Sequence, residues 1–214
     1  MQAASKRIPT MMLVLCAMFA ALMAVGAWIS IPVFSIPITL QLLAIMVAAA
    51  LLPPTYATLS VVVYVLLGLV GLPVFSNFTG GVGRLFSITG GYIIGFIPAA
   101  WLTSFLVKKW GPAWWKQALA MVLGVLVCYA FGTVWFMLMN QQNVAAYNAT
   151  LADMTETQLA EAGGRKSAYT LMQTLSICVF PYIPFDLIKI AISVALCRLL
   201  RKPMQTVLRQ SRLR

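Results

Sequence analysis

The sequence predicts an all-α integral membrane protein, a bundle of six transmembrane helices with the N- and C-termini in the cytoplasm. The first observation is composition: 62% of the 214 residues are hydrophobic, only 9% are charged, and the mean hydropathy is +0.93. A soluble domain carries about 25% charged residues, so this chain cannot cover a water-exposed surface. The second observation is that the charges lie between long apolar runs. Residues 1–214 therefore form a single membrane domain.

The first three spans come from one uncharged stretch. No charged residue lies between Ile8 and Gly83, which is longer than one span of about 20 residues requires. Prolines at 31–37 and 52–55 divide the stretch, because each removes a backbone donor and disfavours helix in the residue before it. The predicted spans are 10–29, 39–52 and 55–71, and the second is short for a membrane helix.

Two further spans follow the same logic. An uncharged run from Leu85 to Val107 ends at Lys108, and another begins after Lys116 and fades into the polar residues 140–143. Both runs are long enough to cross a bilayer.

The last apolar stretch, 167–200, would be about 51 Å long as a single helix, which exceeds a hydrocarbon core of about 30 Å. Pro181 and Pro184 divide it. We assign 168–180 to a partly inserted or interfacial segment and 182–200 to the sixth span.

Basic residues orient the bundle. Six spans place both termini on one side, and eleven of the 15 basic residues lie there, against three on the other side and one inside the sixth span. By the positive-inside rule, the side with the termini is cytoplasmic. The eleven are Lys6, Arg7, Lys108, Lys109, Lys116, Arg198, Arg201, Lys202, Arg209, Arg212 and Arg214.

Composition excludes several kinds of chemistry. The chain has no histidine, which excludes His-based catalysis and His metal sites. The four cysteines lie in apolar runs without CxxC spacing and are interpreted as buried side chains. The net charge is +11, and the basic residues lie between the apolar spans. This position is typical of residues that set membrane topology, so we predict no nucleic-acid partner. We therefore predict no catalytic residue, no metal and no cofactor.

Asp186 and Lys189 are the sharpest feature of the sequence. Each ionisable group at the centre of a span costs about 2.5–3.5 kcal/mol, and a spacing of three places both on one helix face. Pro181 and Pro184 precede them, and broken helices at membrane depth are tolerated where they line a cavity. A polar ligand site is therefore predicted here, with a self-neutralising ion pair as the alternative.

A glycine-rich outer connection runs from Gly71 to Arg84 and closes with Thr89-Gly90-Gly91-Tyr92. Glycines permit close backbone approach, and Arg84 could hold a carboxylate. A tight turn with a snorkelling arginine is the alternative. Tyr92 closes this connection and joins the predicted binding set.

Small residues mark the first span and basic residues mark the last. The small residues recur at three- and four-residue spacing, which lets another helix approach closely. That partner is either an internal helix or a separate subunit. The docking set is Ala17, Ala20, Ala21 and Ala24.

The basic tail from Arg198 to Arg214 favours anionic membrane lipid.

The stretch Gly163 to Ser167 hints at a phosphate-binding loop. The leading glycine of such a loop would have to be at 159, which is Leu. The chain therefore has no visible means of hydrolysing ATP.

Four stretches together resemble the BioY family, the biotin-binding S-components of energy-coupling factor (ECF) vitamin transporters. They occur in the family's order along most of the chain: Pro37-Ile38-Thr39-Leu40-Gln41, Gly68-Leu69-Val70-Gly71-Leu72-Pro73-Val74-Phe75, Thr89-Gly90-Gly91-Tyr92-Ile93-Ile94-Gly95-Phe96 and Pro181-Tyr182-Ile183-Pro184-Phe185-Asp186-Leu187-Ile188-Lys189.

The resemblance implies a six-helix protein of the bacterial inner membrane that captures biotin from outside. It implies that Asp186 and Lys189 are polar ligand contacts, with Arg84 and Asn77 contributing from the loop. It also implies a transmembrane coupling subunit and cytoplasmic ATPase subunits as partners, with the first helix as their docking surface.

Two other classes stay open at this point. One is a stand-alone secondary transporter of a small vitamin-like anion, which the lack of an ATPase motif would suit. The other is an intramembrane hydrolase with a Ser-Lys pair built on Lys189.

Overall fold

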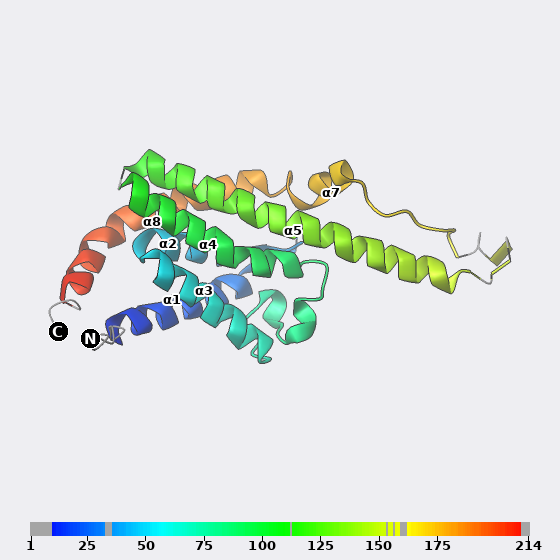
Figure 1. The fold of residues 1–214 in the computed structure, drawn as a ribbon, viewed down its shortest axis with the longest axis horizontal. Coiled ribbons are helices and arrows are strands. Elements are labelled where there is room, and N and C mark those ends of the chain that lie inside the picture. The colour runs from blue at the N-terminus through cyan, green and yellow to red at the C-terminus, as the bar shows by residue number, and fades with distance from the viewer. Residues whose placement is uncertain are drawn as a thin grey trace, which may run out of the picture.

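A computed structural model describes residues 10–32, 36–111, 113–152, 154–155, 157–158 and 162–210. It is largely helical (Figure 1). The helices are α1 Thr10–Trp28, α2 Gln41–Leu51, α3 Pro54–Leu69, α4 Gly90–Trp110, α5 Trp114–Thr150, α7 Leu171–Cys178 and α8 Ile183–Gln210.

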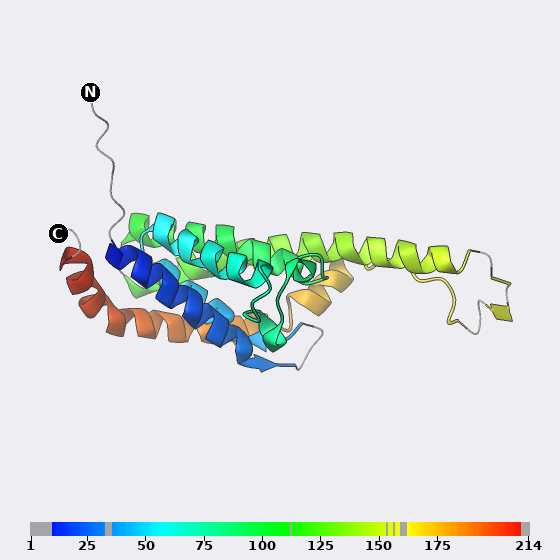
Figure 2. The same ribbon diagram turned by 90° about the horizontal axis from the view of Figure 1, so that it is seen from below.

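The helices form one elongated bundle around an apolar core. α4 and α5 pack along each other, α1 packs on α2 and α3, and α2 packs on α4 and α8 (Figures 1 and 2). Between them lies a cluster of fully buried side chains that includes Met23, Ile45, Met46, Tyr64 and Met121. The large side chains on the outer faces are also apolar, which is typical of helices in contact with lipid.

Helix length and composition identify a multi-pass membrane protein. Within the described residues, α1, α4 and α5 are each long and apolar enough to cross a bilayer. α2, with 11 residues, is only about 17 Å long and agrees with the short second span predicted from the prolines. Six helices in the described part of the chain have 11 or more residues, at the positions of the six predicted spans.

Glycines allow α4 and α5 to approach closely. A Cβ on Gly91 would lie 2.1 Å from the Cβ of Trp135, and one on Gly132 would lie 2.3 Å from the Tyr92 ring. Only glycine fits at these two positions, so part of the Thr89-Gly90-Gly91-Tyr92 motif serves helix packing.

The connection between α1 and α2 contains two strands that an all-α prediction did not include. β1 (Ser30–Ile31) pairs antiparallel with β2 (Ile38–Thr39), with Ser30 opposite Thr39. Pro32 and Pro37 favour extended backbone in the residues before them, which suits the ends of a short hairpin.

The fifth helix is longer than predicted. α5 has 37 residues, about 55 Å, and continues through the polar residues 140–143 to Thr150, beyond the rest of the bundle (Figure 1). The returning chain stabilises this extension: the Asn148 amide donates to Lys166 O (2.8 Å) and accepts from Lys166 N (2.9 Å). The Tyr147 hydroxyl also donates to Ala162 O over 2.8 Å.

Two helix boundaries also differ from the sequence analysis. α4 begins at Gly90 and not near Leu85, because the 3-10 turn at 82–84 is followed by further turns through 85–89. α8 continues to Gln210, past the predicted end at 200, with Pro203 inside it.

α1 begins and α8 ends at the same end of the bundle (Figures 1 and 2). Lys108 and Lys109 lie in the last turn of α4, which ends there too. Of the eleven basic residues assigned to this side, five lie outside the described side chains. These are Lys6, Arg7, Arg209, Arg212 and Arg214.

Candidate functional site

The first turns of α8 present two buried charges. The helix begins at Ile183, and Pro184 is accommodated because the first-turn N–H groups of a helix have no intrahelical partner. Asp186 lies in that turn, where the helix dipole favours a negative charge. Lys189 follows one turn later, and its Nζ lies 2.8 Å from Asp186 Oδ1. The residues are 6% and 8% exposed, so the pair is held away from solvent.

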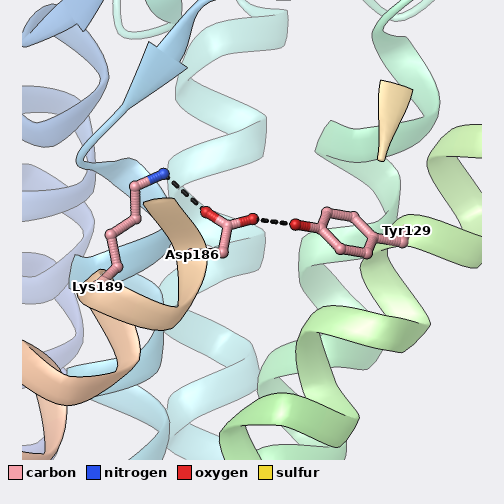
Figure 3. Close-up of polar contacts among 3 residues, drawn as sticks. All are labelled: Tyr129, Asp186 and Lys189. Atoms are coloured by element: carbon pink, nitrogen blue, oxygen red, sulfur yellow. Dashed lines mark hydrogen bonds and ion pairs between the residues drawn. The ribbon is translucent and has the colours of Figure 1, made fainter. Parts of the chain in front are cut away.

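A third side chain completes this cluster. Tyr129 of α5 donates its hydroxyl hydrogen to Asp186 Oδ2, so each carboxylate oxygen has a partner (Figure 3). Sequence reasoning missed Tyr129. The available signal was a single hydroxyl-bearing aromatic in the middle of an apolar span, which does not say what lies opposite.

A cavity of about 70 Å³ lies near the cluster, between the outer loop, the β1–β2 connection and the start of α4. Its lining residues come from four separate segments. They are Ile36, Pro37, Thr39, Gln41, Phe75, Ser76, Arg84, Thr89, Tyr92, Ile93 and Phe96.

The structure brings Arg84 and Tyr92 of the predicted binding set to this cavity. Arg84 is half-buried, and its guanidinium donates to Ser76 Oγ over 3.4 Å. Asn77 is exposed and does not line the cavity; it has a φ of 58°, in the left-handed region that suits a turn.

Two hydrogen-bonded tethers join the cavity wall to the segment before Asp186. The Tyr182 hydroxyl donates to Ile36 O (2.7 Å) and accepts from Ile36 N (2.9 Å), and Ile36 lines the cavity. The Tyr92 hydroxyl donates to Cys178 O over 3.2 Å. Asp186 itself does not line the cavity, so the predicted set divides into two neighbouring polar centres.

The small-residue set on α1 also divides. Ala20 and Ala24 are 2% and 7% exposed and belong to the core formed with α2 and α3. Ala17 and Ala21 are exposed. Internal packing, one of the two alternatives, therefore accounts for Ala20 and Ala24, and only Ala17 and Ala21 are accessible to another subunit.

The cysteines are buried and unlinked, and the part of the chain described contains no group of three or more Cys, Asp or Glu side chains that could hold a metal ion. What the site offers is one carboxylate, two cations and several hydroxyls among apolar walls. This arrangement can bind a small molecule that carries both hydrogen-bond donors and an anionic group.

The chain is similar to known proteins over most of its length. The chain matches the model of the BioY family over residues 1–206. It is 35% identical over 190 residues to a biotin transporter BioY of Thermotoga maritima, covering 89% of this chain and 95% of that protein. It is 30% identical over 189 residues to the biotin transporter BioY of Rhodobacter capsulatus, covering 86% and 90%.

A solved structure has the same fold. The crystal structure of the S-component for biotin from an ECF-type ABC transporter matches with a TM-score of 0.72 and 26% identity, covering 94% of this chain and 95% of that one. With a family match over nearly its whole length and a shared fold, the chain belongs to the BioY family.

Proposed function

We propose that the chain is the biotin-binding S-component of an ECF transporter and captures biotin from the outer side of the membrane. The single observation that carries this proposal is the buried Asp186–Lys189 pair, in contact with Tyr129, in a chain of the BioY family. Relatives that align over most of the chain are biotin transporters, and the matched structure is a biotin S-component.

The chemistry of biotin suits these side chains. The molecule has a ureido group that donates and accepts hydrogen bonds, an apolar bicycle, and a carboxylate on a flexible chain. Asp186 accepts from a ureido N–H, Lys189 donates to a ligand oxygen while balancing Asp186, and Arg84 pairs with the carboxylate. The assignment requires charge-assisted hydrogen bonds at both ends of the ligand.

The cavity must enlarge to admit biotin. A volume of about 70 Å³ is well below the roughly 300–1,000 Å³ of small-molecule sites. The outer loop turns at Gly71, with φ 107°, and at Gly81, with φ 91°, which glycine adopts without steric cost. We infer that ligand entry displaces this loop, and that Asn77 contacts the ligand only after such a displacement.

Energy for uptake comes from other subunits in this proposal. The sequence lacks a phosphate-binding loop, and the matched S-component belongs to an ECF-type ABC transporter. The chain therefore associates with a transmembrane coupling subunit and cytoplasmic ATPases, through the exposed face of α1 that carries Ala17 and Ala21. A secondary transporter has less support, because Asp186 is the only carboxylate within the predicted spans.

The proposed location is a bacterial cell membrane, with six spans and cytoplasmic termini. Basic residues at the ends of α4 and α8 support this orientation and would contact anionic lipid. The full span count and orientation rest on the sequence pattern and on the shared end of α1 and α8 (Figure 2).

The chain is not an enzyme, since its curated relatives are transporters. The Ser-Lys hydrolase alternative has less support from the geometry. Lys189 Nζ lies 2.8 Å from Asp186 Oδ1, whereas the lysine of a Ser-Lys pair must bond the nucleophilic serine.

Purification in detergent tests the proposed function. Protein expressed in cells supplied with biotin and washed on a column should retain biotin, released on denaturation and quantified by mass spectrometry at about one molecule per chain. Absence of retained biotin, together with no rebinding of added biotin, would overturn the proposal.

A further inference from the structure

Gln41, the first residue of α2, is a buried polar side chain that the scheme above does not use. It is 5% exposed, and its Nε2 has no hydrogen-bond partner. The Tyr64 hydroxyl is a neighbour of the amide, but the two groups do not meet the geometry of a hydrogen bond. The Tyr64 hydroxyl instead donates a hydrogen bond to Val74 O over 3.0 Å. Buried donors in native proteins nearly always have an acceptor. The hydroxyls of Ser30, Thr133 and Ser193 are also buried without a partner, but of these four residues only Gln41 lines the cavity, where a ligand atom can supply the acceptor.

The amide lines the same cavity as Arg84. No Asp or Glu is among the described residues that line this cavity. Apart from Gln41 and Arg84, the polar side chains in the lining bear hydroxyls, and they are Thr39, Ser76, Thr89 and Tyr92. A cavity with one cation, several hydrogen-bond donors and no carboxylate favours an anionic group.

The backbone at this position has the same preference. α2 has 11 residues, begins at the cavity, and lacks a side-chain cap at Leu40. Its first N–H groups and the positive end of its dipole favour an anion. Helix end, amide and guanidinium therefore point to the same kind of ligand group.

From this geometry we infer that Gln41 is a specificity-determining residue that donates from Nε2 to the carboxylate of bound biotin, beside Arg84. The inference rests on the proposed function, and it assigns the two ends of the ligand to different polar centres. The carboxylate lies at the start of α2, and the ureido group lies at Asp186.

The test compares biotin with biotinamide, which lacks the carboxylate charge. Equilibrium binding is measured on the detergent-purified wild type, Gln41→Met and Gln41→Glu. Gln117→Met is the matched control, because Gln117 is 3% exposed and does not line the cavity. Monodispersity and thermal stability of every variant are measured alongside.

Gln41→Met should weaken biotin binding about ten- to hundredfold, the effect of losing one hydrogen bond to a charged group, and should weaken biotinamide binding less than about threefold. Gln41→Glu places a carboxylate beside the carboxylate of biotin. It should therefore weaken biotin binding further and favour the binding of biotinamide. Gln117→Met should leave both affinities unchanged.

Equal losses for the two ligands in well-folded Gln41 variants would overturn the assignment, and so would unchanged affinities. Failure of the proposed function gives a different result, since wild-type protein would then bind neither ligand. Should Gln41→Met fail to fold, Gln41→Glu, which keeps the size of the side chain, decides the question through the ratio of the two affinities.

Discussion

Tyr129 and Asp186 are 57 residues apart in sequence and are joined across the bundle by a hydrogen bond from the phenol of α5 to Oδ2 of the α8 carboxylate (Figure 3). Lys189 occupies the other oxygen. The two side chains therefore hold the carboxylate in one orientation. Preorganisation of this kind reduces the free energy that binding must spend on ordering side chains.

Tyr129→Phe removes this hydrogen bond and keeps the ring. We expect biotin binding to weaken about two- to tenfold, since a typical net hydrogen bond contributes about 0.5–1.5 kcal/mol. Isothermal titration on purified protein measures the change. Tyr147→Phe is the matched control, because Tyr147 lies on the extension of α5 and its hydroxyl donates to Ala162 O. This variant should bind biotin as tightly as the wild type does. Wild-type affinity in Tyr129→Phe would show that the phenol does not position Asp186.

Lys189→Met leaves Asp186 buried without its counter-ion. Breaking a buried pair in this way costs about 3–5 kcal/mol, so we expect a lower thermal unfolding temperature in detergent and loss of biotin binding. The double variant Asp186→Asn with Lys189→Met removes both charges and should recover much of the stability while binding stays weak. A double variant as unstable as Lys189→Met alone would contradict the pairing argument.

Substitutions on the two faces of α1 should separate packing from docking. Ala20→Leu adds volume to a filled core and should destabilise the protein by about 1–3 kcal/mol. Ala17→Leu and Ala21→Leu lie on the exposed face and should leave stability and biotin affinity unchanged. If α1 docks a coupling subunit, these two changes should weaken co-purification of the complex. Intact complexes with both exposed variants would assign docking to another surface.

Topology is tested by single cysteines in a protein without its four native ones. Cysteines at Asn143 and Gln158 should react with an impermeant maleimide added to intact cells, and cysteines at Ala113 and Thr206 only after lysis. The physical reason is the positive-inside distribution of lysine and arginine. The reverse pattern would overturn the orientation.

Local sequence signals sufficed for the helical class, for the break between α2 and α3, and for one contact in the candidate site. The double proline at 53–54 separates α2 from α3 as predicted, because proline effects act on adjacent residues. The Asp186–Lys189 contact followed from helical spacing alone. Each of these features depends on residues within one turn of each other.

Other features depend on distant parts of the chain. Tyr129 could not be placed beside Asp186 without the packing of α5 on α8. The extension of α5 to Thr150 depends on the returning backbone at Lys166, which satisfies the Asn148 amide. The alanine pattern of α1 gave the spacing of small residues but not which face turns inward, since all faces of that helix are apolar.

We propose that Asp186 binds the ureido group of biotin, and equilibrium titration of wild type and Asp186→Asn in parallel tests this role most directly. Asparagine has the size of aspartate and removes the charge. Loss of a charge-assisted hydrogen bond in a buried site costs about 1.5–3 kcal/mol. We expect saturable one-to-one binding by the wild type and at least ten- to hundredfold weaker binding by a folded Asp186→Asn variant. Equal affinity of the two proteins for biotin would contradict this role.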